Sequence, residues 1–249
     1  DGHVIEEHTY FGAGPDNDKA QTTQSDGGNY AYTLSYDSPT QTTVTNSLGT
    51  NTVYTLDSFK GVVTQSSGPG CASCGGGGTT ATLTYDNFLN LRSVTDGRSV
   101  ITEMTYDGKG NVLTRKEAKG TGSERTWIYT WNSTFGFPAT ITIPSVGTCA
   151  NANKVITNSY NGVGDKTTEQ VTGCNDNATF TYTTTWTYDS HGQIKTVTGP
   201  RTDLSDVTTF DYYADGDANP NSRGRVQDVK NALNQQTDHA GYDLFGNVG

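Results

Sequence analysis

Apolar and polar residues alternate along much of this chain. Trp127, Tyr129 and Trp131 share one parity, with Ile128 and Thr130 between them. A period of two is typical of strands that bury one face. No stretch shows the sustained three-to-four spacing of an amphipathic helix, so we expect an all-β fold with almost no helix.

An aromatic residue followed by Asp or Asn, with Gly or Asn three or four residues later, recurs at intervals of roughly 20–30 residues, a period typical of repeat architectures. One supersecondary unit is therefore predicted to stack along the chain. The clearest copies are Tyr106-Asp107 with Gly110, Tyr188-Asp189 with Gly192, Tyr242-Asp243 with Gly246 and Tyr160-Asn161 with Gly164. Looser copies begin at Tyr36-Asp37, Tyr54, Tyr85-Asp86, Trp131-Asn132 and Tyr213.

Each copy predicts a β-hairpin. Asp at the first position and Gly at the fourth favour a type I turn, in which the carboxylate accepts backbone N–H bonds and Gly takes the left-handed conformation beside a bulge. A second, more variable connection carries Gly or Asn, as at Asp96-Gly97 and Leu48-Gly49. The recurring tyrosine is expected to stack between neighbouring strands as a ladder that fixes their register.

This pattern resembles the YD repeat of Rhs proteins, a family that also includes teneurins, wall-associated bacterial proteins and shell-forming components of insecticidal toxin complexes. The resemblance extends from about Tyr36 to Asn247. It implies antiparallel β-hairpin repeats stacked into a continuous spiralling sheet, a shell or a solenoid. Residues 1–249 would form a single array of about eight to nine repeats, and we expect them to be an internal segment of a longer chain.

Some copies depart from the pattern. Those at Tyr54 and Trp131 lack the Asp. Leu89 stands where Gly110 stands in its own repeat, and Pro39 occupies a position that a type I turn disfavours. The turns of these copies are expected to differ from the others.

Composition agrees with a strand-rich array. The chain has 30 Gly and 14 Tyr, its hydrophobic content of 31% is low for a compact core, and its charged content of 17% lacks the signature of disorder. Sheet faces covered by aromatic and Thr side chains are the expected solution. No Pro-rich or charge-rich linker divides the chain, which favours one array.

The four cysteines bear on the compartment. Cys149 and Cys174 flank a strand-rich segment, and a disulfide between them is expected in a secreted protein. For Cys71 and Cys74 a local disulfide in a Gly-rich loop is favoured over free thiols and over metal, because neither a second Cys pair nor a redox helix is visible.

Charge limits the partners. A formal net charge of −10 and no basic stripe argue against nucleic acid, and no apolar stretch is long enough to span a membrane. Residues 215–221 present oxygen ligands at alternating positions, but Pro220 replaces the Gly of an EF-hand and Val226 its bidentate Glu. No cofactor is expected, and calcium stays a minor alternative there.

Catalysis is not expected. The chain has no Gly-x-Ser-x-Gly elbow, His-Glu-x-x-His or P-loop motif. Its histidines are scattered, and His191 lies at a turn position that Lys109 and Phe245 occupy in other copies. A position that varies so freely between repeats indicates exposure.

The resemblance implies a structural role outside the cell or at the bacterial cell surface, as part of a shell around a C-terminal toxin or cargo domain of the same longer chain. Two alternatives stay open. One is an adhesion or recognition module, whose exposed aromatics and turn loops contact a glycan or another cell. The other is a self-assembling fibre, in which open strand edges pair between chains.

Overall fold

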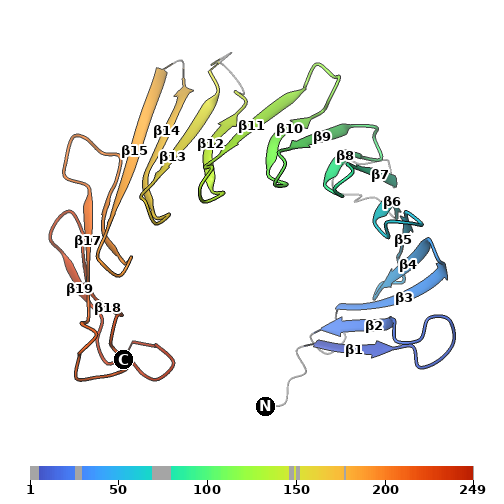
Figure 1. Ribbon diagram of the computed structural model, residues 1–249, viewed down its shortest axis with the longest axis horizontal. Coiled ribbons are helices and arrows are strands. Elements are labelled where there is room, and N and C mark those ends of the chain that lie inside the picture. The colour runs from blue at the N-terminus through green and yellow to red at the C-terminus, as the bar shows by residue number, and fades with distance from the viewer. Residues whose placement is uncertain are drawn as a thin grey trace. The chain divides into compact units, whose positions relative to one another are not determined.

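A computed structural model describes residues 6–25, 30–68, 80–145, 149, 152–176 and 178–248. Its 19 strands are antiparallel, and no helix occurs among these residues (Figure 1). The predicted fold class, an all-β protein of antiparallel hairpin repeats, is thereby confirmed. The chain divides into two compact units, residues 1–126 and 127–249, which are described separately; the expectation of a single array stays a prediction.

In the first unit every two consecutive strands pair with each other. The ten strands are β1 (Glu6–Tyr10), β2 (Ala20–Ser25), β3 (Tyr30–Ser38), β4 (Gln41–Asn46), β5 (Asn51–Leu56), β6 (Val63–Ser67), β7 (Thr80–Tyr85), β8 (Leu91–Thr95), β9 (Ile101–Tyr106) and β10 (Val112–Glu117). The unit is thus an antiparallel meander, the arrangement that short connections between neighbouring strands produce.

The second unit repeats this meander. Its strands are β11 (Arg125–Trp131), which begins just before the boundary, β12 (Pro138–Ile143), β13 (Lys154–Tyr160), β14 (Lys166–Asn175), β15 (Ala178–Tyr188), β16 (Ile194–Thr198), β17 (Val207–Tyr212), β18 (Val226–Lys230) and β19 (Gln236–Asp238). The longest pair is β14–β15, whose ladder runs from Thr168 opposite Thr185 to Asn175 opposite Ala178.

A bulge interrupts most hairpins beside the turn. The register shifts at Tyr85, Trp131, Tyr160, Tyr188 and Tyr212, the last residue of the incoming strand in each case. A bulge at this place accompanies a turn that ends in a left-handed residue. The turn chemistry and the ladder register are therefore set together.

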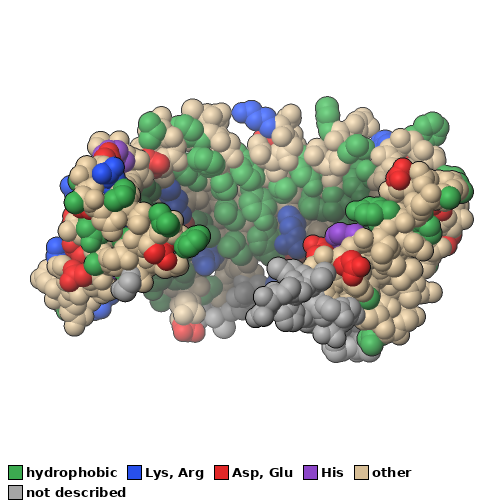
Figure 2. All heavy atoms as spheres, turned by 90° about the horizontal axis from the view of Figure 1, so that it is seen from below, with side chains coloured by type: hydrophobic (Ala, Val, Ile, Leu, Met, Phe, Trp, Pro, Cys, Tyr) green, Lys and Arg blue, Asp and Glu red, His purple; other side chains and the backbone are tan. Residues whose placement is uncertain are grey.

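The two faces of each meander differ. We call the face that carries the repeat tyrosines the tyrosine face; in the second unit its cross-strand pairs include Ile141 with Ile156 and Trp186 with Val197. The opposite, threonine face carries pairs such as Thr140 with Thr157. Hydrophobic side chains lie side by side on the surface seen in Figure 2, with Lys and Arg side chains beside them.

Neither face is deeply buried. Among the described hydrophobic residues only Tyr242, 8% exposed, counts as buried, and no described side chain is fully buried. The sheet therefore lacks a second layer within the described parts of the chain, and its stability rests on contacts between neighbouring strands.

Candidate functional site

The repeat turns form the most regular chemical feature of the molecule. In the 107–111 turn, Oδ1 of Asp107 accepts the backbone N–H bonds of Lys109 at 2.8 Å and Asn111 at 2.9 Å. The N–H of Gly110 donates to the Asp107 carbonyl at 3.1 Å, and Nδ2 of Asn111 donates to Oδ2 of Asp107 at 2.9 Å. These bonds hold the pKa of the Asp107 carboxyl below its usual value, the side-chain bond from Asn111 contributing most.

The same two-bond arrangement occurs in turns at both ends of the strands. An Asp or Asn oxygen accepts the N–H groups two and four residues later at Asp86, Asn161, Asp189 and Asp243, which follow repeat tyrosines, and at Asn46, Asp96 and Asn231, which head the second connections. A short acceptor side chain at the first position thus closes the loop wherever it occurs.

The fourth position of the turns is left-handed. The φ angles of Gly110, Gly164, Gly192 and Gly246 are 85°, 101°, 80° and 87°. Leu89 takes the same conformation, with a φ of 66°. The expectation that its turn would differ is therefore wrong: the hydrogen bonds of Asp86 impose the common geometry on a residue that pays for it in strain.

Two of the looser copies need correction. The copy predicted to begin at Tyr213 begins one residue earlier, at Tyr212, where β17 ends and its register shifts. Asp37 lies within β3 and not at the first position of a turn, because the chain runs on to Ser38 and turns at Pro39 and Thr40. Its carboxylate instead accepts bonds from the hydroxyl groups of Ser35 and Thr43. Proline, which fixes φ and has no N–H, suits this tighter connection.

The copies without Asp-Gly spacing form longer loops. In the copy at Tyr54 the turn begins at Asp57, whose Oδ1 accepts the N–H groups of Phe59 and Lys60. Asn132 does the same for Thr134 and Phe135. The left-handed glycine comes one residue later than in the other turns, at Gly61 and Gly136.

Seven repeat tyrosines join successive hairpins. Each of the seven donates its hydroxyl hydrogen to a backbone carbonyl of the preceding hairpin, at 2.7–3.0 Å. The pairs are Tyr36 with Ala20, Tyr85 with Val63, Tyr106 with Leu91, Tyr160 with Pro138, Tyr188 with Lys166, Tyr212 with Ile194 and Tyr242 with Val226.

These carbonyls lie beyond the paired part of the ladder between hairpins. The pairing of β8 with β9, for example, stops at Ser93 opposite Glu103, so Leu91 has no partner on β9. The hydroxyl of Tyr106 therefore bridges two hairpins where their strands have separated. Burial, and to a lesser degree the charge of Asp86, raise the pKa of Tyr106 and keep it a donor; Tyr188 and Tyr212 behave alike.

Hydroxyl pairs tie the strands together on the threonine face. The hydroxyl oxygens of Thr105 and Thr114 lie 2.6 Å apart, as do those of Thr187 and Thr196. Those of Thr130 and Thr140 lie 2.7 Å apart. In these three pairs one partner directly precedes the aromatic residue of its copy, Tyr106, Tyr188 or Trp131. Sequence reasoning missed both the tyrosine bridges and these pairs, although the recurring Thr-Tyr dipeptide was a signal for them.

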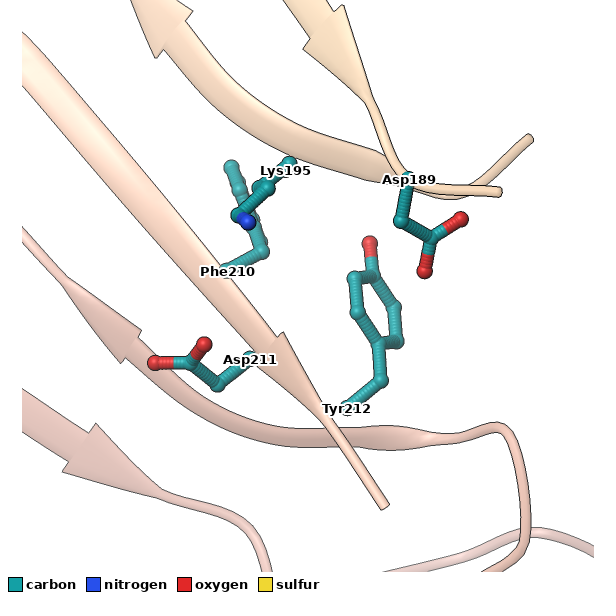
Figure 3. A pocket seen from close by; sticks show the side chains of 5 residues that line it. All are labelled: Asp189, Lys195, Phe210, Asp211 and Tyr212. Atoms are coloured by element: carbon teal, nitrogen blue, oxygen red, sulfur yellow. The ribbon is translucent and has the colours of Figure 1, made fainter. Parts of the chain in front are cut away.

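Small hollows open between successive hairpins beside the turns. The one in Figure 3, of about 170 Å³, is lined by Asp189, Lys195, Phe210, Asp211 and Tyr212. A second, of about 240 Å³, lies between the 86–90 and 107–111 turns. Both hollows are lined by a carboxylate, an ammonium group and an aromatic ring. These groups can contact a polar ligand, but they do not pair a nucleophile with a base.

Possible metal and histidine chemistry is sparse in the described residues. No group of three His, Cys, Asp or Glu side chains among them could hold a metal ion. In the 215–221 stretch, Oδ1 of Asp217 and Oδ1 of Asn219 accept backbone N–H bonds, the behaviour of a surface turn. The side chain of His191 is exposed at its turn, and its Nε2 lies 3.3 Å from Oδ2 of Asp215. The expectation of no cofactor, with calcium as a minor alternative, and the expectation of no catalysis both stay predictions.

A disulfide joins Cys149 and Cys174, with an S–S distance of 2.02 Å. It ties the connection before β13 to the far end of β14. The prediction on Cys71 and Cys74 lies outside the described residues, as does His3. No helix within the described ranges is long and apolar enough to cross a membrane.

Comparison with known proteins finds matches among solved structures. No family model matches the chain, and no curated protein matches it. Among solved structures it is similar to the crystal structure of TcdB2-TccC3-TEV, with a TM-score of 0.45 and 11% identity over 98% of this chain. It is also similar to the Photorhabdus luminescens Tc holotoxin pore, with a TM-score of 0.48 and 14% identity over 95% of this chain.

A third similar structure is a porin-like protein from Bacteroides uniformis, with a TM-score of 0.35 and 16% identity over 82% of this chain and 91% of that one. The chain spans 15% of the length of each of the two Tc chains.

Proposed function

We propose that this chain is a non-catalytic structural wall of an extracellular or surface-exposed Rhs-like protein, and that its tyrosine face lies toward an enclosed toxin or cargo domain. The observation that carries the proposal is the difference between the two faces. One bears half-buried aromatic and aliphatic side chains with no second layer in the described ranges, and the other bears hydroxyls.

The turns and tyrosine bridges support a scaffold role. The recurring Asp and Asn side chains close loops, and the recurring Tyr hydroxyls join successive hairpins. These recurring polar groups therefore have structural roles in turns and bridges, and the turns do not pair a nucleophile with a base. The chain's own contribution to function is then an extended surface.

The test uses the full-length protein of which this chain would be the wall. Electron microscopy should reveal hollow ovoid particles, and the enclosed domain should resist protease. Ile156→Lys, on the tyrosine face, should make that domain sensitive to protease, because an unpaired charge on an apolar face weakens its cover. Thr157→Lys, the adjacent residue on the threonine face, is the matched control. Long filaments, or equal effects of the two variants, would overturn the proposal.

Adhesion is a second candidate, favoured by one observation. Phe59, Phe88 and Phe245 are 98%, 84% and 89% exposed at the tips of the turns. The equivalent positions in the 107–111 and 189–193 turns carry Lys109 and His191, so the turn does not require an aromatic residue. If the role is recognition, Phe59→Ser with Phe88→Ser would abolish binding to cells and leave particle shape unchanged.

A further inference from the structure

The 161–165 turn differs from its equivalents by an exchange of side chains. In the 86–90, 107–111 and 243–247 turns an Asp at the first position accepts a bond from the side-chain amide of an Asn at the fifth. Here Asn161 stands first and Asp165 fifth, and Nδ2 of Asn161 donates to Oδ2 of Asp165 at 2.9 Å. The hydrogen bond is the same, with its donor and acceptor reversed.

The exchange places an amide directly before a glycine. Asn161-Gly162 is the one Asn-Gly dipeptide in the sequence. Gly162 has no side chain to block its amide nitrogen, an added Cβ would meet nothing within 4 Å, and the residue does not adopt a left-handed φ. No bond from its N–H is found within the described residues. The nitrogen is thus available to attack the neighbouring amide carbon.

The turn also supplies what such an attack needs. Oδ1 of Asn161 accepts the N–H bonds of Val163 at 3.0 Å and Asp165 at 2.9 Å. Two backbone donors on one carbonyl oxygen stabilise the negative charge that develops on it, as in an oxyanion hole. The carboxylate of Asp165, bonded to Nδ2, is placed to relay a proton to the departing ammonia.

We propose that Asn161 is a self-deamidation site built into the turn. The nitrogen of Gly162 bonds to Cγ of Asn161, the Cγ–Nδ2 bond breaks, and the proton of the Gly162 N–H leaves with Nδ2 as ammonia. Water then opens the resulting succinimide to give aspartate or isoaspartate. The overall change is one water consumed, one ammonia released and one carboxylate gained.

The product would weaken its own turn. An aspartate at position 161 faces Asp165, so two carboxylates replace the bonded amide–carboxylate pair, and like charges at that separation repel. An isoaspartate would in addition lengthen the backbone inside the loop. The β13–β14 hairpin, which Tyr160 joins to the preceding hairpin through the Pro138 carbonyl, would loosen as the protein ages.

Asn231 is a natural control within the same chain. It heads a turn with the same two bonds to Oδ1, at 2.9 and 3.0 Å, but Ala232 follows it and its Nδ2 donates to the neutral side chain of Gln235. It thus shares the oxyanion donors of Asn161 and lacks both the glycine and the carboxylate.

The experiment is peptide mapping by mass spectrometry of the whole chain after incubation at mildly alkaline pH. Loss of the amide at Asn161 should be at least about tenfold faster than at Asn231, and Gly162→Ala should bring the two rates together; a tenfold ratio corresponds to about 1.4 kcal/mol in the barrier. Equal rates at Asn161 and Asn231, or a rate that Gly162→Ala leaves unchanged, would overturn the proposal.

The consequence for the turn is measured separately, by thermal unfolding. Asn161→Asp should lower Tm by about 2–4 °C, and the double variant Asn161→Asp with Asp165→Asn should restore it, because it recreates the pair of Asp107 and Asn111. If Asn161→Asp melts like the wild-type chain, or the double variant fails to recover, the loosening is refuted.

Discussion

At the scale of single residues, side-chain hydrogen bonds dictate backbone conformation in this molecule. Leu89 holds a φ of 66° that a leucine disfavours, because the N–H groups on either side of it, those of Phe88 and Asn90, both donate to Asp86. Tyr106 has a similar effect between hairpins, because its hydroxyl donates to the Leu91 carbonyl, which lies beyond the paired residues of β8 and β9.

Leu89→Gly should raise the free energy of unfolding by about 0.5–1 kcal/mol. Relief of the left-handed strain gains roughly 1–2 kcal/mol, and the greater freedom of glycine in the unfolded chain offsets part of it. Urea denaturation measures the change. Gly192→Leu is the reverse control. Gly192 has a φ of 80°, and an added Cβ would meet nothing within 4 Å. The variant should therefore lose stability through backbone strain alone. A loss of stability in Leu89→Gly would contradict the strain argument.

Tyr106→Phe should destabilise the chain by about 0.5–1.5 kcal/mol, the usual net value of one hydrogen bond. It removes the 2.7 Å bond to the Leu91 carbonyl and keeps the ring. Tyr182→Phe is the control, because Tyr182 is 52% exposed and stacks on Phe180 through its ring; it should stay within about 0.5 kcal/mol of wild type. Equal losses in both variants would show that the bridge contributes nothing.

At the scale of elements, most hairpins combine a closed turn, a bulge and a tyrosine bridge. The sequence predicted the turns at Asp107 and Asp189 from the Asp-to-Gly spacing, because that spacing has a local cause. It did not locate the turn near Asp37, where one proline moved the loop into a shorter connection. The bridges could not be foreseen in the same way, because the accepting carbonyl lies 15 to 22 residues away in all seven pairs and only the register brings it close.

The turns and bridges predict a stability plateau between mildly acid and mildly alkaline pH. Turn aspartates such as Asp107 have lowered pKa values, so their contribution is present above the unfolded pKa of about 4 and is lost as pH falls below it. Tyr106, Tyr188 and Tyr212 have raised pKa values, so theirs is present below about pH 10 and is lost as pH rises through the folded pKa.

Tm measured from pH 3 to 11 checks the plateau. The same scan at high salt is the control, because salt screens the repulsion expected from a net charge of −10 and leaves the turn hydrogen bonds in place. A Tm at pH 3 that equals or exceeds the value at pH 6 in high salt would contradict the role assigned to the turn carboxylates.

At the scale of the whole molecule, neighbour pairing determines how the chain can be assembled. Within each unit, the described strands pair with the strands before and after them in sequence. Such contacts are local, and locally connected chains fold quickly. A polypeptide built in this way can fold in the order in which it leaves a ribosome or a secretion pore, each new hairpin fastening its tyrosine to the one already formed, so that no part of it must wait exposed for a distant partner to arrive.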